Sequence, residues 1–366
     1  MEAFFRQSWC LCGLPFDAVN ASSAISSLKL AIKENRPFFL STPNLNFLIA
    51  AQTDKAFRES VINSDLSVAD GMPLIWMSRL LNIPIPERVA GSNLIEALFA
   101  EKNTPPIRVF FFGGEPGVGE KACQIINQAD AGLQAVGHYC PGFGSVEGMS
   151  APEIIDEINR HEIDFLIVSL GARKGQAWIE KNRHQLKAPV ISHLGAVINF
   201  FAGTVKRAPV WMQRIGLEWL WRILEEPLLW KRYFFDGLRF AKLLLNNVIP
   251  YAIWIRFNQK KLNEIKPVII NTEEDSQTIK IYLIGTCIDK TIAALRPVFN
   301  ECVLKKKNIL IDLQAVPVID GAFLGLCLLL YKHLNQHGCQ LNFQNINQQN
   351  IRIFKWNSAQ YLIPQL

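Results

Sequence analysis

The sequence predicts an α/β protein with a Rossmann-like parallel sheet, a helical basic appendage and a second, smaller α/β domain. Short apolar runs alternate with helical patterns over the first two-thirds of the chain. From about residue 205 the pattern turns helical, basic and rich in tryptophan, and strand–helix alternation resumes after a polar stretch at 258–275. Strands that alternate with helices are typical of parallel sheets. We therefore expect three regions, at 1–204, 205–260 and 270–366, with 258–275 as a linker.

The first region contains five apolar runs of strand length, separated by helical patterns. In doubly wound sheets ligands bind at the carboxyl ends of the strands, so the loops that follow these runs are the candidate site. The expected strands are 37–44, 66–71, 107–114, 163–171 and 188–195, and the expected helices are 45–64, 118–129 and 174–186.

The last region repeats the alternation on a smaller scale and predicts a compact module of about 95 residues. Its expected strands are 277–288, 308–316 and 340–346, and its expected helices are 290–306 and 321–338.

Positive charge is concentrated between residues 205 and 261. This segment has eleven Lys and Arg residues against four Asp and Glu residues, an excess of seven, whereas the whole chain has a net charge of +6. Five of the nine tryptophans also lie there. Such local asymmetry predicts an acidic partner: phosphate, nucleic acid or anionic lipid.

Several other classes are disfavoured. The most apolar segment, 238–257, contains charged residues, and its uninterrupted apolar part has eight residues, whereas a membrane span needs about 20. A helix lying on the bilayer surface remains open. The N-terminus does not look like a signal peptide, and the eight cysteines show no metal-ligand spacing, so we expect reduced, buried thiols.

Polar residues follow several of the predicted strands. Asp70, in "VADGMP", is placed to act as a general base, although an N-cap or Asx turn is an equally simple role. Thr42 and Asn44, in "STPNLN", can bind a sugar or cap a helix. Arg88 lies in the loop "ERVAGSN", which also contains Asn93.

A glycine-rich loop, "FFGGEPGVGEKA", separates a predicted strand from a helix. Its backbone N–H groups, from Gly113 and Gly114 onward, can bind a diphosphate. The loop lacks the GxGxxG order, so a nicotinamide cofactor is only weakly indicated, and a tight turn is an equal alternative.

In the basic segment, Arg214, Glu218 and Arg222 are spaced four apart. This spacing places them on one face of a helix, where Glu218 can bridge the two arginines.

Taken together, these loops resemble the WecG/TagA/CpsF glycosyltransferase family, which includes N-acetylmannosaminyl and N-acetylmannosaminuronic acid transferases of bacterial surface-polymer synthesis. The resemblance covers roughly residues 10–245. It rests on "TPNLNFL", "VADGMPLIW", "ERVAGSNLIEAL", "VFFFGG", "LGARKGQAWI" and "GTVKRAPVWMQRIGLEWLWRILEEPLLWKRY".

The resemblance implies a metal-independent enzyme without a cofactor. It transfers a hexose, N-acetylhexosamine or its uronate from a UDP-sugar to a polyprenyl-diphosphate-linked sugar with inversion, and Asp70 is the general base. The appendage is expected to bring arginines to the site and to bind the anionic inner face of the plasma membrane peripherally, so we expect a cytoplasmic protein without a nucleic acid partner. The implied substrate-binding residues are Thr42, Asn44, Arg88, Asn93, Gly113, Gly114, Gln176, Lys206, Arg207, Arg214, Glu218, Arg222 and Arg232.

One loop departs from the family pattern. The family reads G-x-P-[KR]-Q-E where this chain has "GARKGQ", so that Arg173, Gly175 and Gln176 replace Pro, Gln and Glu. The departure indicates either a different donor sugar or lost activity. A non-catalytic sensor of nucleotide sugars is therefore the alternative function.

The tail resembles a sulfate transporter and anti-sigma factor antagonist (STAS) domain, on the basis of "IYLIGTCID" and "NILIDLQAVPVIDGAFLGLCLLLYKHLNQHG". Regulatory members have a serine two residues after the Asp at the strand-to-helix turn, but here Ala322 follows Asp320 at that distance. We therefore expect no kinase switch there, and docking to a protein partner, self-association or a purely structural role remain.

Overall fold

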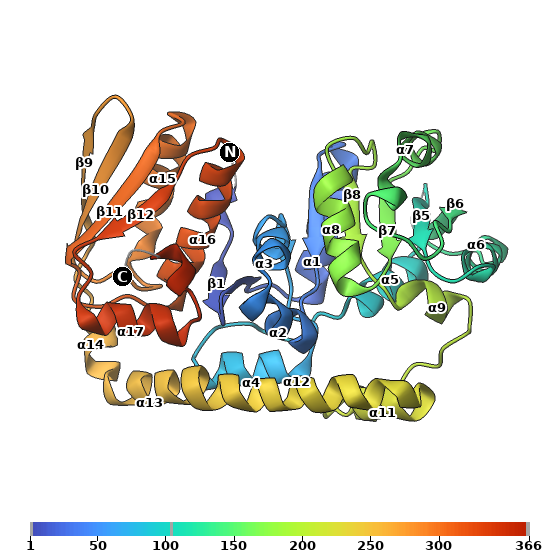
Figure 1. The fold of residues 1–366 in the computed structure, drawn as a ribbon, viewed down its shortest axis with the longest axis horizontal. Helices are drawn as coiled ribbons and strands as arrows, with labels where there is room; N and C mark the ends of the chain where they lie inside the picture. Colours follow the sequence, from blue (N-terminus) through green and yellow to red (C-terminus); the bar gives the residue numbers. More distant parts are fainter. Residues whose placement is uncertain (1–2, 103–104, 364–366) are drawn as a thin grey trace.

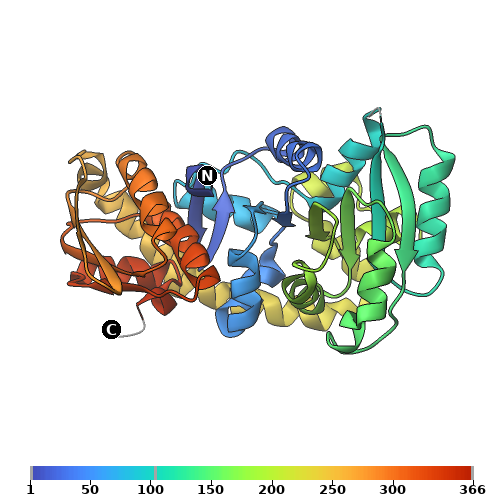
Figure 2. The ribbon, with the colours of Figure 1, turned by 90° about the horizontal axis from the view of Figure 1, so that it is seen from above.

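A computed structural model describes residues 3–102 and 105–363. It contains an α/β body, formed by the described residues up to about 204, and a C-terminal domain that begins at about residue 269. The two lie side by side above one long helical arm, at about 205–263 (Figures 1 and 2). This confirms the predicted fold class: a parallel α/β sheet, a helical appendage and a smaller α/β domain.

The body is built on a six-stranded sheet in the order β4-β3-β8-β7-β5-β6, in which every pairing is parallel. All five predicted strands are present. The sixth strand, β6, was missed because it lies at the sheet edge and mixes buried, part-buried and exposed residues without a regular apolar run. The strands are β3 (Phe38–Ser41), β4 (Leu66–Ser67), β5 (Ile107–Gly113), β6 (Leu133–Tyr139), β7 (Phe165–Ser169) and β8 (Val190–His193).

Helices cover both faces of this sheet. Apolar residues of α1, α5, α6 and α9 pack on one face, and those of α7 and α8 pack on the other. The predicted helix 45–64 is two helices, because Asp54 ends the first and its side chain accepts a hydrogen bond from Phe57 N in the second. The body helices are α1 (Ala21–Lys33), α2 (Leu45–Thr53), α3 (Lys55–Ile62), α4 (Met72–Leu80), α5 (Gly91–Ala100), α6 (Val118–Gln128), α7 (Pro152–Asn159), α8 (Ala172–Asn182) and α9 (Val197–Phe201).

The arm runs beneath both domains (Figure 1). A π-helical turn at Leu244–Val248 joins α12 to α13, directly before Pro250, which has no N–H to donate to a regular helical ladder. The arm helices are α10 (Val210–Arg214), α11 (Glu218–Glu225), α12 (Trp230–Leu243), α13 (Ile249–Phe257) and α14 (Gln259–Asn263).

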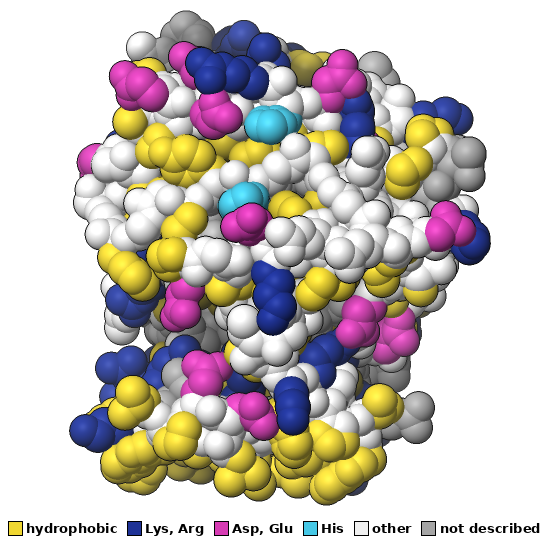
Figure 3. Space-filling model, turned by 90° about the vertical axis from the view of Figure 1, so that its right-hand side faces the viewer, with side chains coloured by type: hydrophobic (Ala, Val, Ile, Leu, Met, Phe, Trp, Pro, Cys, Tyr) yellow, Lys and Arg dark blue, Asp and Glu magenta, His cyan; other side chains and the backbone are white. Residues whose placement is uncertain are grey.

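The outer face of the arm is apolar. Figure 3 shows hydrophobic side chains gathered along the lower edge of the molecule, with Lys and Arg side chains just above them. Trp76 and Leu80 of α4 are exposed as well. The exposed large apolar residues of the arm include Val210, Trp211, Ile215, Trp219, Leu224, Leu228, Trp230, Phe234, Phe235, Leu238, Leu245, Ile253 and Phe257.

The C-terminal domain has a four-stranded sheet in the order β12-β11-β10-β9. β9 pairs antiparallel with β10, and the other pairings are parallel. The predicted linker at 258–275 was therefore largely wrong, because residues 259–263 form α14 and residues 269–274 form the edge strand β9. The elements are β9 (Ile269–Glu274), β10 (Thr278–Ile284), α15 (Leu295–Leu304), β11 (Asn308–Ala315), α16 (Gly321–Gln336), β12 (Leu341–Gln344) and α17 (Gln348–Trp356).

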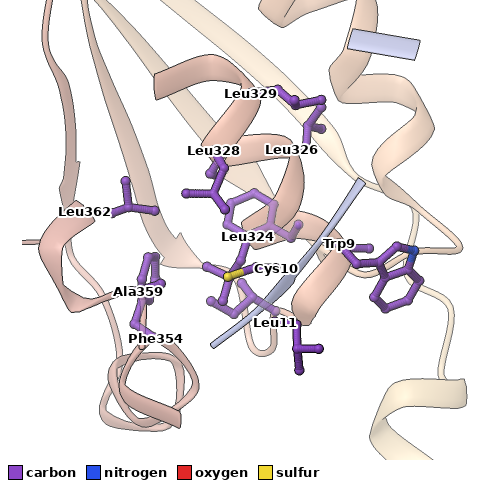
Figure 4. Packing of buried hydrophobic residues seen from close by; sticks show 14 of the residues in the cluster. Trp9, Cys10, Leu11, Leu324, Leu326, Leu328, Leu329, Phe354, Ala359 and Leu362 are labelled. Carbon is purple, nitrogen blue, oxygen red and sulfur yellow. The ribbon is translucent and has the colours of Figure 1, made fainter. Parts of the chain in front are cut away.

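An N-terminal hairpin of the body, β1 (Ser8–Leu11) and β2 (Leu14–Asp17), packs against α16, and one apolar core joins the two domains. Figure 4 shows Trp9, Cys10 and Leu11 among leucines of α16. The approach is so close that a Cβ added to Gly325 would lie 2.1 Å from the Ser8 carbonyl oxygen. Such burial stabilises by roughly 1.5–3 kcal/mol for each fully buried large side chain.

Candidate active site

Asp70 lies just beyond the carboxyl end of β4, at the edge where ligands bind in such sheets. Its backbone N–H donates to the Pro43 carbonyl at 2.9 Å, and its side chain accepts a hydrogen bond from the backbone of Gly91, at the start of α5. The N-cap of α4 is Gly71 and has no side-chain cap, so the alternative role of Asp70 as a cap of the following helix is wrong.

The environment of Asp70 sets its proton affinity. Burial raises the pKa of this carboxyl group to about 6, with nearby Arg88 acting to lower it and Glu218 to raise it. Because this pKa lies below neutrality, Asp70 is mostly ionised at pH 7 and remains basic enough to accept a proton.

Arg88 connects the body to the arm. Its guanidinium lies 2.9 Å from the Glu218 carboxylate, and its side chain is only 11% exposed. The predicted common helix face is wrong for Arg214, because Gly216 has φ +77° and separates α10 from α11. Glu218 and Arg222 do lie four residues apart on one helix, α11. Glu218 faces Arg88 of the body.

Arg207 forms a second connection. Its guanidinium donates to Asn93 Oδ1 at 2.5 Å, to Ser92 Oγ at 3.2 Å and to Gln213 Oε1 at 3.3 Å. It also pairs with Glu96. Arg207 is close enough to Asp70 to lower its pKa, so these cations and the carboxylate share one site.

The two polar residues that follow β3 behave differently. Thr42 is 7% exposed and lies against the position that a side chain at Gly91 would occupy, which places it beside the Asp70 cluster. Asn44 caps α2, and its Oδ1 accepts from Phe47 N at 3.2 Å. The capping alternative is therefore confirmed for Asn44. Contact of its side-chain NH2 group with a sugar remains a prediction.

The glycine loop stands at the carboxyl end of β5. Gly113 and Gly114 have φ of +105° and +83°, and a Cβ at Gly113 would lie 2.5 Å from the Ser169 carbonyl oxygen. Only glycine therefore fits at the end of β5, where the chain turns sharply, and this agrees with the tight-turn alternative. Binding of a diphosphate by this loop remains a prediction.

Gln176 has no exposed surface. It lies between Ser41 Oγ and Ser60 Oγ, each 3.3 Å away, inside the body. Its predicted contact with the donor sugar is therefore not supported by this geometry. Arg173, in the first turn of the same helix α8, is exposed, with its Nε 4.0 Å from Asp54.

The remaining predicted cations lie farther along the arm. Arg222 pairs with Glu226 at 3.5 Å and lies over the Phe200 ring, as Arg207 does. Lys206 and Arg232 are exposed, and the side chain of Arg214 lies outside the described part of the structure. Within the described part, none of Lys206, Arg222 and Arg232 bonds to the Asp70 cluster.

Sequence reasoning missed three members of this region: Glu96, Phe200 and Gln213. Glu96 follows Asn93 by three residues, a helical spacing that puts both side chains on one face of α5. A shallow hollow beside Arg207 is lined by Ser92, Glu96, Val197, Phe200 and Phe201.

This arrangement combines a carboxylate of raised pKa with partly buried guanidinium groups at the carboxyl edge of a parallel sheet. The carboxylate can take a proton from a hydroxyl group, and guanidinium groups suit phosphate oxygens. The described residues hold no cluster of three or more His, Cys, Asp or Glu side chains arranged to bind a metal ion. The site therefore has the parts of an enzyme that acts on an anionic substrate.

Comparison with known proteins identifies the class. Residues 9–252 match the glycosyl transferase WecG/TagA/CpsF family, and residues 269–359 match the STAS domain. Because the first match covers more than half of the chain, the protein belongs to the WecG/TagA/CpsF glycosyltransferase family.

Three similar curated proteins are each named N-acetylglucosaminyldiphosphoundecaprenol N-acetyl-beta-D-mannosaminyltransferase. The protein from Bacillus subtilis is 30% identical over 220 residues, and that from Bacillus spizizenii is 28% identical over 220 residues. A Staphylococcus aureus protein is 26% identical over 222 residues. Each match covers 60% of this chain and 84% of the relative.

Among the described helices, none is long and apolar enough to cross a bilayer.

Proposed function

We propose that the protein transfers an N-acetylhexosamine, its uronate or a hexose from a UDP-sugar to a polyprenyl-diphosphate-linked N-acetylglucosamine, with inversion. The relatives are named for transfer of N-acetylmannosamine to such an acceptor. The observation that carries the proposal is the position of Asp70, a partly buried carboxylate beside Arg88 and Arg207 at the sheet edge.

In the proposed reaction, Asp70 accepts the proton of the acceptor hydroxyl as its oxygen attacks the anomeric carbon. The bond from that carbon to the UDP oxygen breaks, and UDP leaves as an anion. Direct displacement inverts the anomeric configuration. Arg88 and Arg207 lie close enough to Asp70 to lower its pKa, and their guanidinium groups can stabilise the developing phosphate charge.

The arm provides a route to a lipid acceptor. Its apolar face is lined by tryptophans, which favour the headgroup region, and each basic residue near an anionic surface contributes roughly 1 kcal/mol. Peripheral attachment to an anionic membrane through this face would bring the lipid diphosphate to Glu218 and Arg88, where the arm contacts the body.

The test is a transfer assay with a panel of UDP-sugars and a lipid-diphosphate N-acetylglucosamine acceptor, with products identified by mass. We expect Asp70→Asn to lower kcat about 10²–10⁴-fold while UDP binding stays near the wild-type value. The matched control is Asp130→Asn, an exposed carboxylate paired with Lys102. Wild-type turnover by Asp70→Asn would refute the role of this residue.

One observation favours the alternative, a nucleotide-sugar sensor without catalytic activity. In the segment that departs from the family pattern, at the start of α8, Gln176 faces the interior of the body. Binding of a UDP-sugar without any product in the same assay would support the sensor, and a product of increased mass would exclude it.

A further inference from the structure

A charged side chain of the C-terminal domain ends inside the body. Lys332, on α16, is 4% exposed, and its ammonium group lies 2.7 Å from Asp65 Oδ1 and 3.0 Å from the Ser64 carbonyl oxygen. A buried ammonium is strongly destabilising unless it is paired. The contact therefore favours the one relative placement of the two domains in which Lys332 meets Asp65.

Asp65 also hydrogen-bonds to the sheet of the body, at Phe39 of β3. Its second carboxylate oxygen accepts from Phe39 N at 2.9 Å, and its own N–H donates to Phe39 O at 2.8 Å. The chain then forms β4 at Leu66–Ser67 and reaches Asp70 five residues after Asp65. Lys332 therefore binds residues 64 and 65, at the beginning of the segment 64–70 that ends in Asp70, the proposed base.

A second basic residue reaches the same stretch by another route. Arg296, on α15, donates to the Arg6 carbonyl oxygen at 2.7 Å. The Arg6 guanidinium lies 2.6 Å from Asp17 Oδ2, which in turn accepts from Ser67 N at 2.7 Å. Arg6 also donates to Ser64 O at 2.8 Å. Two lines of contact thus run from the C-terminal domain to residues 64–67.

We infer that Lys332 is a positioning residue for the Asp70 loop, so that the C-terminal domain is a fixed part of the transferase site. Lys332 lies outside the segment that matches the transferase family, which ends at residue 252. The inference rests on the proposed function only where it concerns turnover, because the anchoring of residues 64–70 is a property of the fold.

The experiment compares Lys332→Met, Asp65→Asn and the double variant in the full chain. Asp65→Asn leaves the buried Lys332 ammonium without its counter-charge, Lys332→Met leaves the part-buried Asp65 carboxylate without its own, and the double variant removes both charges. We expect amide hydrogen exchange over residues 64–70 to rise at least tenfold in each single variant and to return within about threefold of wild type in the double variant. We expect kcat to follow the same order, with the donor KM changed less than about threefold.

Lys305→Met is the matched control, because Lys305 pairs with Glu274 inside the C-terminal domain at 2.5 Å. Wild-type exchange at 64–70 in both single variants, or the same rise in Lys305→Met, would overturn the inference. If a single variant does not fold and the double variant does, the rescue supports it. A wild-type protein that transfers no sugar would refute the proposed function, while the exchange measurement would still decide on the anchor.

Discussion

Two junctions of the body differ in kind. Its junction with the C-terminal domain is a continuous apolar core, which also includes Leu243, Val248, Tyr251 and Ile255 of the arm, together with the Lys332–Asp65 ion pair. Its junction with the first part of the arm, at the site, consists of partly exposed polar contacts. Burial of apolar surface lowers the free energy in proportion to the area buried, so a large apolar junction is stable. Polar contacts at a partly wet surface contribute less and depend on ionic conditions. The difference indicates that the C-terminal domain is structural for the site, and that the arm is the part which responds to the membrane and substrate.

The largest effect should come from the apolar junction. Leu328 on α16 is fully buried, so Leu328→Ala should lower the free energy of unfolding by about 2–5 kcal/mol. The control is Leu224→Ala on the arm, which is 67% exposed and should change stability by about 0.5 kcal/mol at most. Urea denaturation measures both. Equal losses in the two variants would mean that the junctions do not differ as described.

The next effect concerns the polar junction. Glu218→Gln removes the counter-charge that holds Arg88, and we expect kcat/KM to fall roughly ten- to hundredfold, equivalent to about 1.4–2.7 kcal/mol. Stability should change little, because Glu218 is part-exposed. Glu225→Gln, on the same helix, is the control. Loss of stability without loss of turnover would contradict a role for Glu218 at the site.

The pH dependence should show the raised pKa of Asp70. Only the ionised carboxylate accepts a proton, so kcat/KM should increase with pH up to about 6 and then level off, falling about tenfold at pH 5. Because the folded-state pKa is above the ordinary value, ionisation of Asp70 opposes folding, and its contribution to stability decreases as pH rises from about 4 to 6. Glu218→Gln should move the acidic limb to lower pH, since Glu218 raises this pKa. An unmoved limb would show that another group titrates.

The smallest effect should be on membrane attachment. Leu228 is 92% exposed on the apolar face of the arm, so Leu228→Ser should weaken binding to anionic vesicles a few-fold. One apolar side chain contributes about 1.5–3 kcal/mol only when it is fully buried, and a side chain at the headgroup level is only partly buried. The control is Leu304→Ser, 73% exposed on the C-terminal domain. Vesicle co-sedimentation at low and high salt measures both. Equal weakening by the two substitutions would show that the arm is not the attachment surface.

Much of this architecture follows from local pattern alone. Apolar strand-length runs between helical periods predict the parallel sheet, because residues buried on both faces must be apolar over their whole length. The concentration of basic and aromatic residues predicts the arm, and the position of Asp70 after a strand predicts its place at the sheet edge. These features depend on residues that are neighbours in sequence.

The tertiary structure decided what depends on distant residues. Glu218 pairs with Arg88 of the body, and Gly216 separates its helix, α11, from the preceding helix α10. Gln176 is buried because its helix packs that side against β3 and α3, and the N-terminal hairpin finds its partner in α16, more than 300 residues away. Helical spacing predicts only which residues lie on the same face of a helix. Which other element packs against that face depends on residues that are distant in sequence, and the local pattern contains no information about them.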